Sequence, residues 1–358
     1  MKNFLYLIIA LSIVACAGKK EIKEETADTV ENIDTVRIKP KYVTQQVISD
    51  TDDPAIWINK SNPSESLIIG TDKGDDGVLG GLYVYNLHGE IDREKSIKNL
   101  ERPNNVDIAY GLPYNGDTID IAVCTERFTN SIRVFKLPEM QAIDNGGIPV
   151  FEDDTLRSPM GIALYTRPSD KQIFAVVGRK EGPTDGSYLY QYELKSNGGV
   201  VKGELVRKFG IWSGEKEIEA IVVDNEAGFV YFSDERNSIR KYYADPAKGN
   251  EELGQFGKDN FLEDREGLSI YKKTDSTGYL LASDQSDNTF HVFTREGNND
   301  FIAELPFSTD QSDGSEVINY NFGSEFPKGI FVAMSDDKTF QIYDWRDIEK
   351  AIEDAMQK

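Results

Sequence analysis

The pattern of apolar and polar residues along the chain is that of short β-strands. Segments rich in β-branched and aromatic residues recur between Gly, Asn and Asp, as in 81–85, 131–135, 188–192 and 289–293. Such segments, bounded by turn-forming residues, are typical of strands. Helical periodicity is nearly absent before residue 345, and the segment 345–356 predicts one short terminal helix. The pattern therefore predicts an all-β fold.

One strand signature recurs six times along the chain. It consists of an acid, a small or branched residue and then Ile or Leu within an apolar segment. The six copies begin at Asp53, Asp107, Met160, Glu219, Glu266 and Glu316, with Met160 replacing the acid in the third. Units of about fifty residues that each carry several strands predict a six-bladed β-propeller. A pair of β-sandwiches is the alternative, because their turns also come at short, regular intervals.

The repeated acid has a chemical consequence. Rotation about the channel of a propeller relates equivalent positions, so five acids in six units predict a ring of carboxylates at one end. Uncompensated carboxylates at that density raise one another's pKa. A hard cation removes the repulsion, and Ca²⁺ suits flexible clusters of carboxylates. For any single acid, capping of its own blade through backbone N–H groups is the alternative.

The N-terminus resembles that of a bacterial lipoprotein. An apolar run over 4–14 follows Lys2; it is too short to span a bilayer but fits a secretory signal. It ends in Ala15-Cys16, which resembles a lipobox with Cys16 as the lipidated residue; an ordinary signal peptide with an incidental Cys is the alternative. We therefore expect a signal peptide over 1–15, a flexible charged tether over 16–40 and the propeller over 41–358. The protein would be lipid-anchored in the bacterial cell envelope, periplasmic or at the cell surface, and would touch the membrane through the anchor alone.

Charge and rare residues exclude several functions. With 62 acidic against 40 basic residues the formal charge is −22, which argues against a nucleic-acid partner. The second cysteine, Cys124, is interpreted as a small buried side chain. A Cys-x5-Arg phosphatase loop is excluded because Asn130 occupies the arginine position, and a histidine acid phosphatase is excluded because no Arg-His-Gly motif exists.

Several phrases resemble the β-propeller phytase family, in the same order along the chain. They cover 52–57, 104–107, 266–271, 279–285 and 327–333, and the likeness extends over about residues 50–348. The resemblance implies a six-bladed propeller that binds several Ca²⁺ ions. It also implies hydrolysis of phosphate monoesters of phytate (inositol hexakisphosphate) or other inositol phosphates, by metal-activated attack of water. We expect a monomer.

The resemblance implies roles for individual residues. The implied metal ligands are Asp53, Glu219, Glu235, Asp264, Glu266 and Asp313. The implied phosphate-binding residues are Lys73, Arg127 and Lys180, and the basic side chains suit phosphate oxygens. Arg127 would also stabilise charge in the reaction, and Glu219 or Glu235 would orient the water. The chain departs from the family at Met160, where members usually have Tyr, and at Thr339, where they have Asn.

Two other functions fit a calcium-binding propeller. One is a non-catalytic surface module and the other is a calcium-dependent lactonase or esterase, because propellers serve many functions. The basic set Lys73, Arg127 and Lys180 favours the phosphatase, since a lactonase needs no such set and a binding module needs no activated water.

Overall fold

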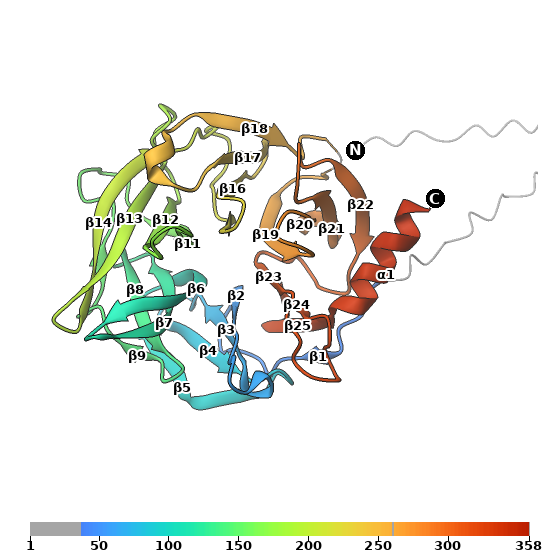
Figure 1. The fold of residues 1–358 in the computed structure, drawn as a ribbon, viewed down its shortest axis with the longest axis horizontal. Coiled ribbons are helices and arrows are strands. Elements are labelled where there is room, and N and C mark those ends of the chain that lie inside the picture. The colour runs from blue at the N-terminus through green and yellow to red at the C-terminus, as the bar shows by residue number, and fades with distance from the viewer. Residues whose placement is uncertain (1–36, 260, 358) are drawn as a thin grey trace, which may run out of the picture. The chain divides into compact units, whose positions relative to one another are not determined.

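The computed structural model describes residues 37–259 and 261–357, which form six antiparallel sheets around a central channel (Figure 1). The prediction of a six-bladed propeller is thus confirmed. The expected signal peptide and Cys16 lie outside the described residues, so lipid attachment stays a prediction. In the part of the chain that is described, no helix is long and apolar enough to cross a membrane.

Each blade follows the chain outward from the channel. The first three blades are β2 (Thr51–Trp57), β3 (Leu67–Asp72), β4 (Gly80–Tyr85) and β5 (Ile91–Leu100); β6 (Pro103–Tyr114), β7 (Asp117–Glu126), β8 (Ser131–Leu137), β9 (Gln141–Ala142) and β10 (Ile148–Pro149); and β11 (Pro159–Thr166), β12 (Ile173–Arg179), β13 (Leu189–Asn197) and β14 (Val200–Phe209).

The other three blades complete the ring. They are β15 (Ile221–Asp224), β16 (Phe229–Asp234), β17 (Ser238–Tyr243) and β18 (Glu252–Phe256); β19 (Arg265–Lys272), β20 (Gly278–Asp284), β21 (Thr289–Thr294) and β22 (Phe301–Pro306); and β23 (Ser315–Ile318), β24 (Ile330–Ser335), β25 (Thr339–Asp344) and β1 (Tyr42–Val43). Three single-turn 3₁₀ helices lie in loops, η1 (Pro63–Glu65), η2 (Pro246–Lys248) and η3 (Gln285–Asp287).

The N-terminal strand closes the ring. β1 is the outermost strand of the last blade, where Tyr42 pairs with Ile342. The contact begins earlier, because the Ile38 amide donates to the Pro306 carbonyl (2.8 Å) and the Ser308 amide donates to the Ile38 carbonyl (3.1 Å). Residues 37–40, expected at the end of the tether, therefore belong to the folded unit.

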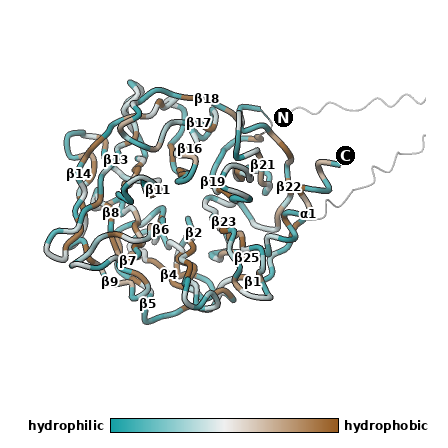
Figure 2. The backbone as a smooth tube through the Cα atoms, in the orientation of Figure 1, coloured by the Kyte–Doolittle hydropathy of each residue, from teal (hydrophilic) through white to brown (hydrophobic). Residues whose placement is uncertain are grey.

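Apolar clusters lie between every two neighbouring blades, six in all for the described residues. Each blade is therefore covered on both faces, and strands next to the innermost one, such as β3, β12 and β20, are buried along their whole length. Figure 2 shows hydrophobic residues along the inner strands and hydrophilic residues on much of the periphery. Cys124 is fully buried in the cluster between the first two blades, as its interpretation as a small apolar side chain predicted.

The predicted terminal helix is α1 (Trp345–Met356). The Asp344 carboxylate caps it by accepting a hydrogen bond from the Arg346 amide (3.0 Å). Its apolar face, with Trp345, Ile348 and Ile352, packs into the cluster between the last two blades. Trp345 stacks on Tyr271 with ring centroids 3.7 Å apart.

Candidate active site

The innermost strands of four blades contain a β-bulge at one end of the channel, where the pairing of β2, β6, β11 and β19 skips two residues. β15 and β23 begin just after this level, and their register places Glu219 and Asp313 at the position equivalent to the first bulge residue. The six equivalent residues are Asp52, Asn104, Met160, Glu219, Glu266 and Asp313. We call these six residues the ring.

This register corrects the alignment of the repeats. The sequence repeat aligned Glu219, Glu266 and Met160 correctly with one another. It also aligned Asp53, Asp107 and Glu316 with them, but these three residues occupy different positions in their strands. Asp53 is the second residue of its bulge, and Asp107 and Glu316 lie three residues beyond the ring. The ring thus has four acids rather than five, because a bulge shifts the side chains relative to a simple count along the strand.

Small residues at the second bulge position let neighbouring blades meet closely. A Cβ atom added to Gly161 would lie 1.9 Å from the Glu219 carbonyl oxygen, and one on Gly267 would lie 2.4 Å from that of Asp313. Hydroxyl groups join the blades at the same level. Thr125 donates to the Met160 carbonyl (2.6 Å) and Ser283 to the Ser312 carbonyl (2.7 Å).

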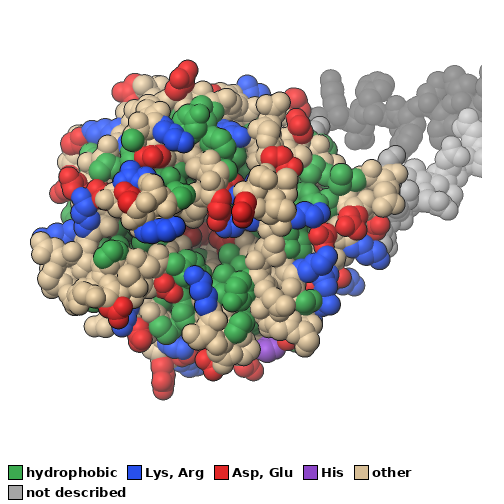
Figure 3. Space-filling view, viewed as in Figure 1, with side chains coloured by type: hydrophobic (Ala, Val, Ile, Leu, Met, Phe, Trp, Pro, Cys, Tyr) green, Lys and Arg blue, Asp and Glu red, His purple; other side chains and the backbone are tan. Residues whose placement is uncertain are grey.

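The ring residues contact one another across the channel. The Asn104 side-chain amide donates to Asp52 (2.8 Å) and contacts Glu219 (3.3 Å), so it joins the first, second and fourth blades. Five of the ring residues line a cavity of about 190 Å³, which we call the mouth. Its remaining lining residues are Lys73, Arg102, Arg127, Lys180, Lys216, Glu217 and Gln285. Figure 3 shows acidic and basic side chains around the central opening.

Two overlapping groups of carboxylates lie beside the mouth. Oxygens of Glu235, Asp264 and Glu266 lie within 4.8 Å of one another, and so do those of Glu217, Glu219 and Glu235. Burial, and then the charges of neighbouring acids, raises the pKa of Glu219 and of Glu266 well above the usual range. Burial also raises the pKa of Glu235 to about 8, although the Lys216 ammonium opposes it. The cluster therefore favours a bound cation.

Asp264 differs from its neighbours. Burial pushes its pKa up, but hydrogen bonds from Lys216 and Arg236 outweigh that effect and hold the pKa below the usual value. It is therefore the member of the cluster that most readily carries a negative charge.

The predicted phosphate-binding residues meet at the mouth. Lys73 lies 3.2 Å from Asp313, 3.3 Å from Asp50 and 3.6 Å from Asp52. Lys180 forms an ion pair with Glu217. Arg127 differs, because its guanidinium group makes no hydrogen bond or ion pair with any described residue, and its Nε atom is buried without a partner. An unpaired guanidinium in an acidic protein is suited to an anionic ligand.

Asp53 lies below the mouth and lines the same lower cavity as Glu219 and Asp313. Its carboxylate accepts a hydrogen bond from the Val106 amide (3.1 Å). The other five, Glu219, Glu235, Asp264, Glu266 and Asp313, lie at or beside the mouth. Neither histidine lies there: His88 pairs with Glu325, and His291 is buried against Phe261.

Several residues of the ring and the mouth were not predicted. Asp52 of the ring, and Asn104 and Gln285 of the mouth, lie within the phrases that carry the family resemblance, so alignment of those phrases could have found them. Arg102, Lys216 and Glu217 lie in loop segments, and no sequence pattern indicates them. Arg102 has a left-handed backbone (φ 59°) immediately before β6.

The carboxylate cluster fits Ca²⁺. Its donors are carboxylate oxygens from two loops and a strand, the ligands that hard cations prefer. The Oε1 atom of Glu235 and the Oδ1 atom of Asp52 are buried and have no hydrogen-bond donor among the described residues. Buried carboxylate oxygens without a donor are costly unless a cation contacts them.

Comparison with known proteins agrees with this geometry. The sequence profile of the Phytase family matches residues 3–357. A 3-phytase of Bacillus subtilis (strain 168) is 31% identical over 324 residues, which cover 83% of this chain and 80% of that protein.

Solved propellers are more distant. The β-propeller domain of Cps50 (Swd1) from Myceliophteria thermophila has a TM-score of 0.49 at 11% identity, covering 84% of this chain and 85% of that one. The Dos1 propeller has a TM-score of 0.42 at 13% identity, covering 82% and 68%. The family profile and the Bacillus relative show that this chain belongs to the phytase family and is a phosphoric monoester hydrolase.

Proposed function

We propose that the enzyme releases phosphate from phytate at the mouth, and that the reaction depends on Ca²⁺ held by the carboxylate cluster. The observation that carries the proposal is the position of Arg127. Its unpaired guanidinium lines the same cavity as Glu219 and Glu266, beside acids that need a cation. A site that pairs clustered carboxylates with unpaired basic groups suits a phosphate bound through a metal and through side chains together.

The buried acids would bind calcium, and the basic residues of the mouth would bind phosphate. Glu235, Asp264 and Glu266 are buried and would hold calcium, with Asp313 in the neighbouring blade and Asp52 in the next. Bound calcium would neutralise phosphate oxygens and lower the pKa of water near the phosphorus. Arg127 can donate two parallel hydrogen bonds to phosphate oxygens, and Lys73 and Lys180 add compact positive charge.

Glu219 is the better candidate to orient the attacking water and take its proton. It lines the mouth together with Arg127 and Lys180, whereas Glu235 is fully buried behind them. The Asn104 amide, which contacts one oxygen of Glu219, holds that carboxylate in place. Proton transfer from water to Glu219 would accompany attack in line with the leaving inositol oxygen.

Calcium removal and return test the proposal. The protein is dialysed against EDTA, and phosphate release from phytate is measured before and after Ca²⁺ is restored. We expect release to fall to background without calcium and to return with it. Full release in excess EDTA would contradict calcium dependence.

A matched pair of variants locates the metal. By calorimetric titration with Ca²⁺, Glu235→Gln should weaken binding by at least about tenfold, because a neutral amide replaces a buried carboxylate ligand. Glu316→Gln is the control: this acid lies on the channel wall below the mouth, and its loss should leave calcium affinity unchanged. If wild type binds calcium but never releases phosphate, the non-catalytic calcium-binding propeller is the better description.

A further inference from the structure

Lys216 occupies the centre of the carboxylate cluster. Its ammonium nitrogen lies 2.7 Å from Glu235, 2.8 Å from Asp264 and 3.5 Å from Glu266. These are the same three acids whose oxygens lie within 4.8 Å of one another. Burial lowers the pKa of Lys216, but the charges of Glu266, Asp264 and Glu235 outweigh it and raise that pKa above its usual value, so the ammonium is charged.

The loop before β15 holds Lys216 in this place. The Trp212 indole N–H donates to the Lys216 carbonyl, and both the backbone amide and the hydroxyl of Ser213 donate to Asp234 (2.9 and 2.7 Å). The backbone is thus fixed at both ends of a short turn. The side chain itself is 29% exposed and lines the mouth, so the ammonium can leave the acids without disturbing the fold.

An ammonium group and a calcium ion compete for these acids. Lys216 contacts the Oε2 atom of Glu235 and the Oδ2 atom of Asp264, and a calcium ion bound to the same carboxylates at about 2.3–2.6 Å would lie close to the ammonium. Two cations that close also repel strongly in a partly buried site. Calcium must therefore displace Lys216, and the lost ion pairs oppose its binding.

We propose that Lys216 is a tethered competitor for calcium at Glu235, Asp264 and Glu266, which sets the calcium concentration at which this site fills. The inference rests on the calcium dependence proposed above. Lys216 supplies positive charge to the acids when calcium is scarce, and it keeps the metal-free fold from carrying three uncompensated buried carboxylates. Asp264 keeps a second partner after displacement, because Arg236 Nε lies 2.8 Å from it.

Calcium titration of matched variants tests the inference. Full-length protein stripped with EDTA is titrated with Ca²⁺ alone by calorimetry. Lys216→Met removes the charge and keeps the length, and we expect calcium to bind at least about tenfold more tightly, since no ion pairs must be broken. Lys216→Arg keeps the charge and should bind calcium as wild type does.

Lys195→Met is the control for loss of a paired lysine. Lys195 lies 2.7 Å from Glu193 and 3.1 Å from Glu204, away from the mouth, so its loss should leave calcium affinity unchanged. Thermal unfolding adds a second readout. Without calcium, Lys216→Met should unfold at a lower temperature than wild type, and in saturating calcium this difference should disappear because Lys216 then makes none of these ion pairs.

The outcomes separate this inference from the proposed function. Equal or weaker calcium binding by Lys216→Met, with calcium-dependent phosphate release intact in wild type, overturns the inference alone. If neither wild type nor Lys216→Met binds calcium, both the inference and the calcium dependence fail.

Discussion

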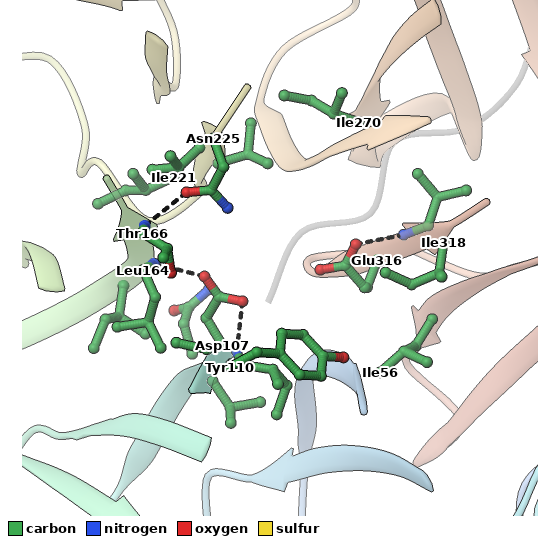
Figure 4. A pocket seen from close by; sticks show the side chains of 18 of the residues that line it. Ile56, Asp107, Tyr110, Leu164, Thr166, Ile221, Asn225, Ile270, Glu316 and Ile318 are labelled. Carbon is green, nitrogen blue, oxygen red and sulfur yellow. Dashed lines mark hydrogen bonds between the residues drawn. The ribbon is translucent and has the colours of Figure 1, made fainter. Parts of the chain in front are cut away.

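The two halves of the central channel differ in what lines them, since loops contribute much of the mouth and the six innermost strands line the cavity below it. The mouth is a cavity of about 190 Å³ lined almost wholly by charged and polar side chains. Below it lies a cavity of about 970 Å³ whose walls combine many Ile, Val, Leu and Ala side chains with polar and charged ones. The acids that line this lower cavity include Asp107 and Glu316, each three residues beyond a ring position (Figure 4).

The lower acids show that a carboxylate in the channel need not form a metal site. Asp107 accepts hydrogen bonds from the Leu164 and Ile108 amides (both 2.6 Å), and Glu316 accepts one from the Val317 amide (2.8 Å). No ion pair joins either acid to a described residue. At the mouth, by contrast, the acids cluster and face lysine and arginine. The neighbours of an acid, rather than its place in a repeat, decide its chemistry.

Removal of Arg127 should give the largest loss of activity. Arg127→Ala takes away the unpaired guanidinium, and kcat/KM for phytate should fall about 10²–10³-fold, the usual loss when one preorganised charge-stabilising group is removed. Steady-state phosphate release measures it. Arg93→Ala, which changes an exposed arginine on β5, is the control and should leave kcat/KM unchanged. A loss of less than about threefold in Arg127→Ala would contradict a phosphate-binding role at the mouth.

The fold was predictable because its signals are local and repeated. The six units appear as recurring apolar segments, and the bounds of α1 follow from the change to helical periodicity at Trp345. The mouth was predictable in composition for the same reason, since Glu219, Glu266 and Asp313 lie in recognisable phrases that precede or begin innermost strands.

The detailed register was not predictable from the repeat. A bulge adds a residue that no count of alternating positions reveals, so Asp53 was chosen where Asp52 faces the ring. Lys216 was missed for a different reason. Its ammonium meets acids 19, 48 and 50 residues away, from two other loops and β19, and only the closed ring brings them together.

Replacement of Glu316, in the lower cavity, should change the stability of the protein rather than its activity. Burial, with the charge of Asp107, raises the pKa of Glu316 from 4.5 to about 8. Between these pH values the folded chain keeps a proton that the unfolded chain has lost, so this acid makes the free energy of unfolding fall as pH rises. Glu316→Gln removes this loss of stability and should raise the free energy of unfolding by about 1–2 kcal/mol at pH 8. This is less than the whole pKa shift corresponds to, because solvent in the cavity screens the charge.

Chemical denaturation at several pH values checks this prediction. The gain should vanish near pH 4, where wild-type Glu316 is protonated in both states, and Glu353→Gln on the exposed face of α1 should show no such dependence. Phosphate release by Glu316→Gln should equal that of wild type. A large loss of activity would show that the two halves of the channel act as one site.

The smallest effect is expected at Met160, the ring position without a polar group. Met160 is 2% exposed and lines the mouth, but a thioether offers neither a strong hydrogen bond nor a hard ligand oxygen. The Met160 backbone carbonyl accepts a hydrogen bond from the Thr125 hydroxyl in the neighbouring blade, and this bond does not depend on the Met160 side chain. Met160→Leu conserves volume, so kcat/KM should change by less than about twofold. A larger loss would mean that the shape of this wall positions the substrate, and the contrast between the mouth and the lower cavity would then rest on packing as well as on charge.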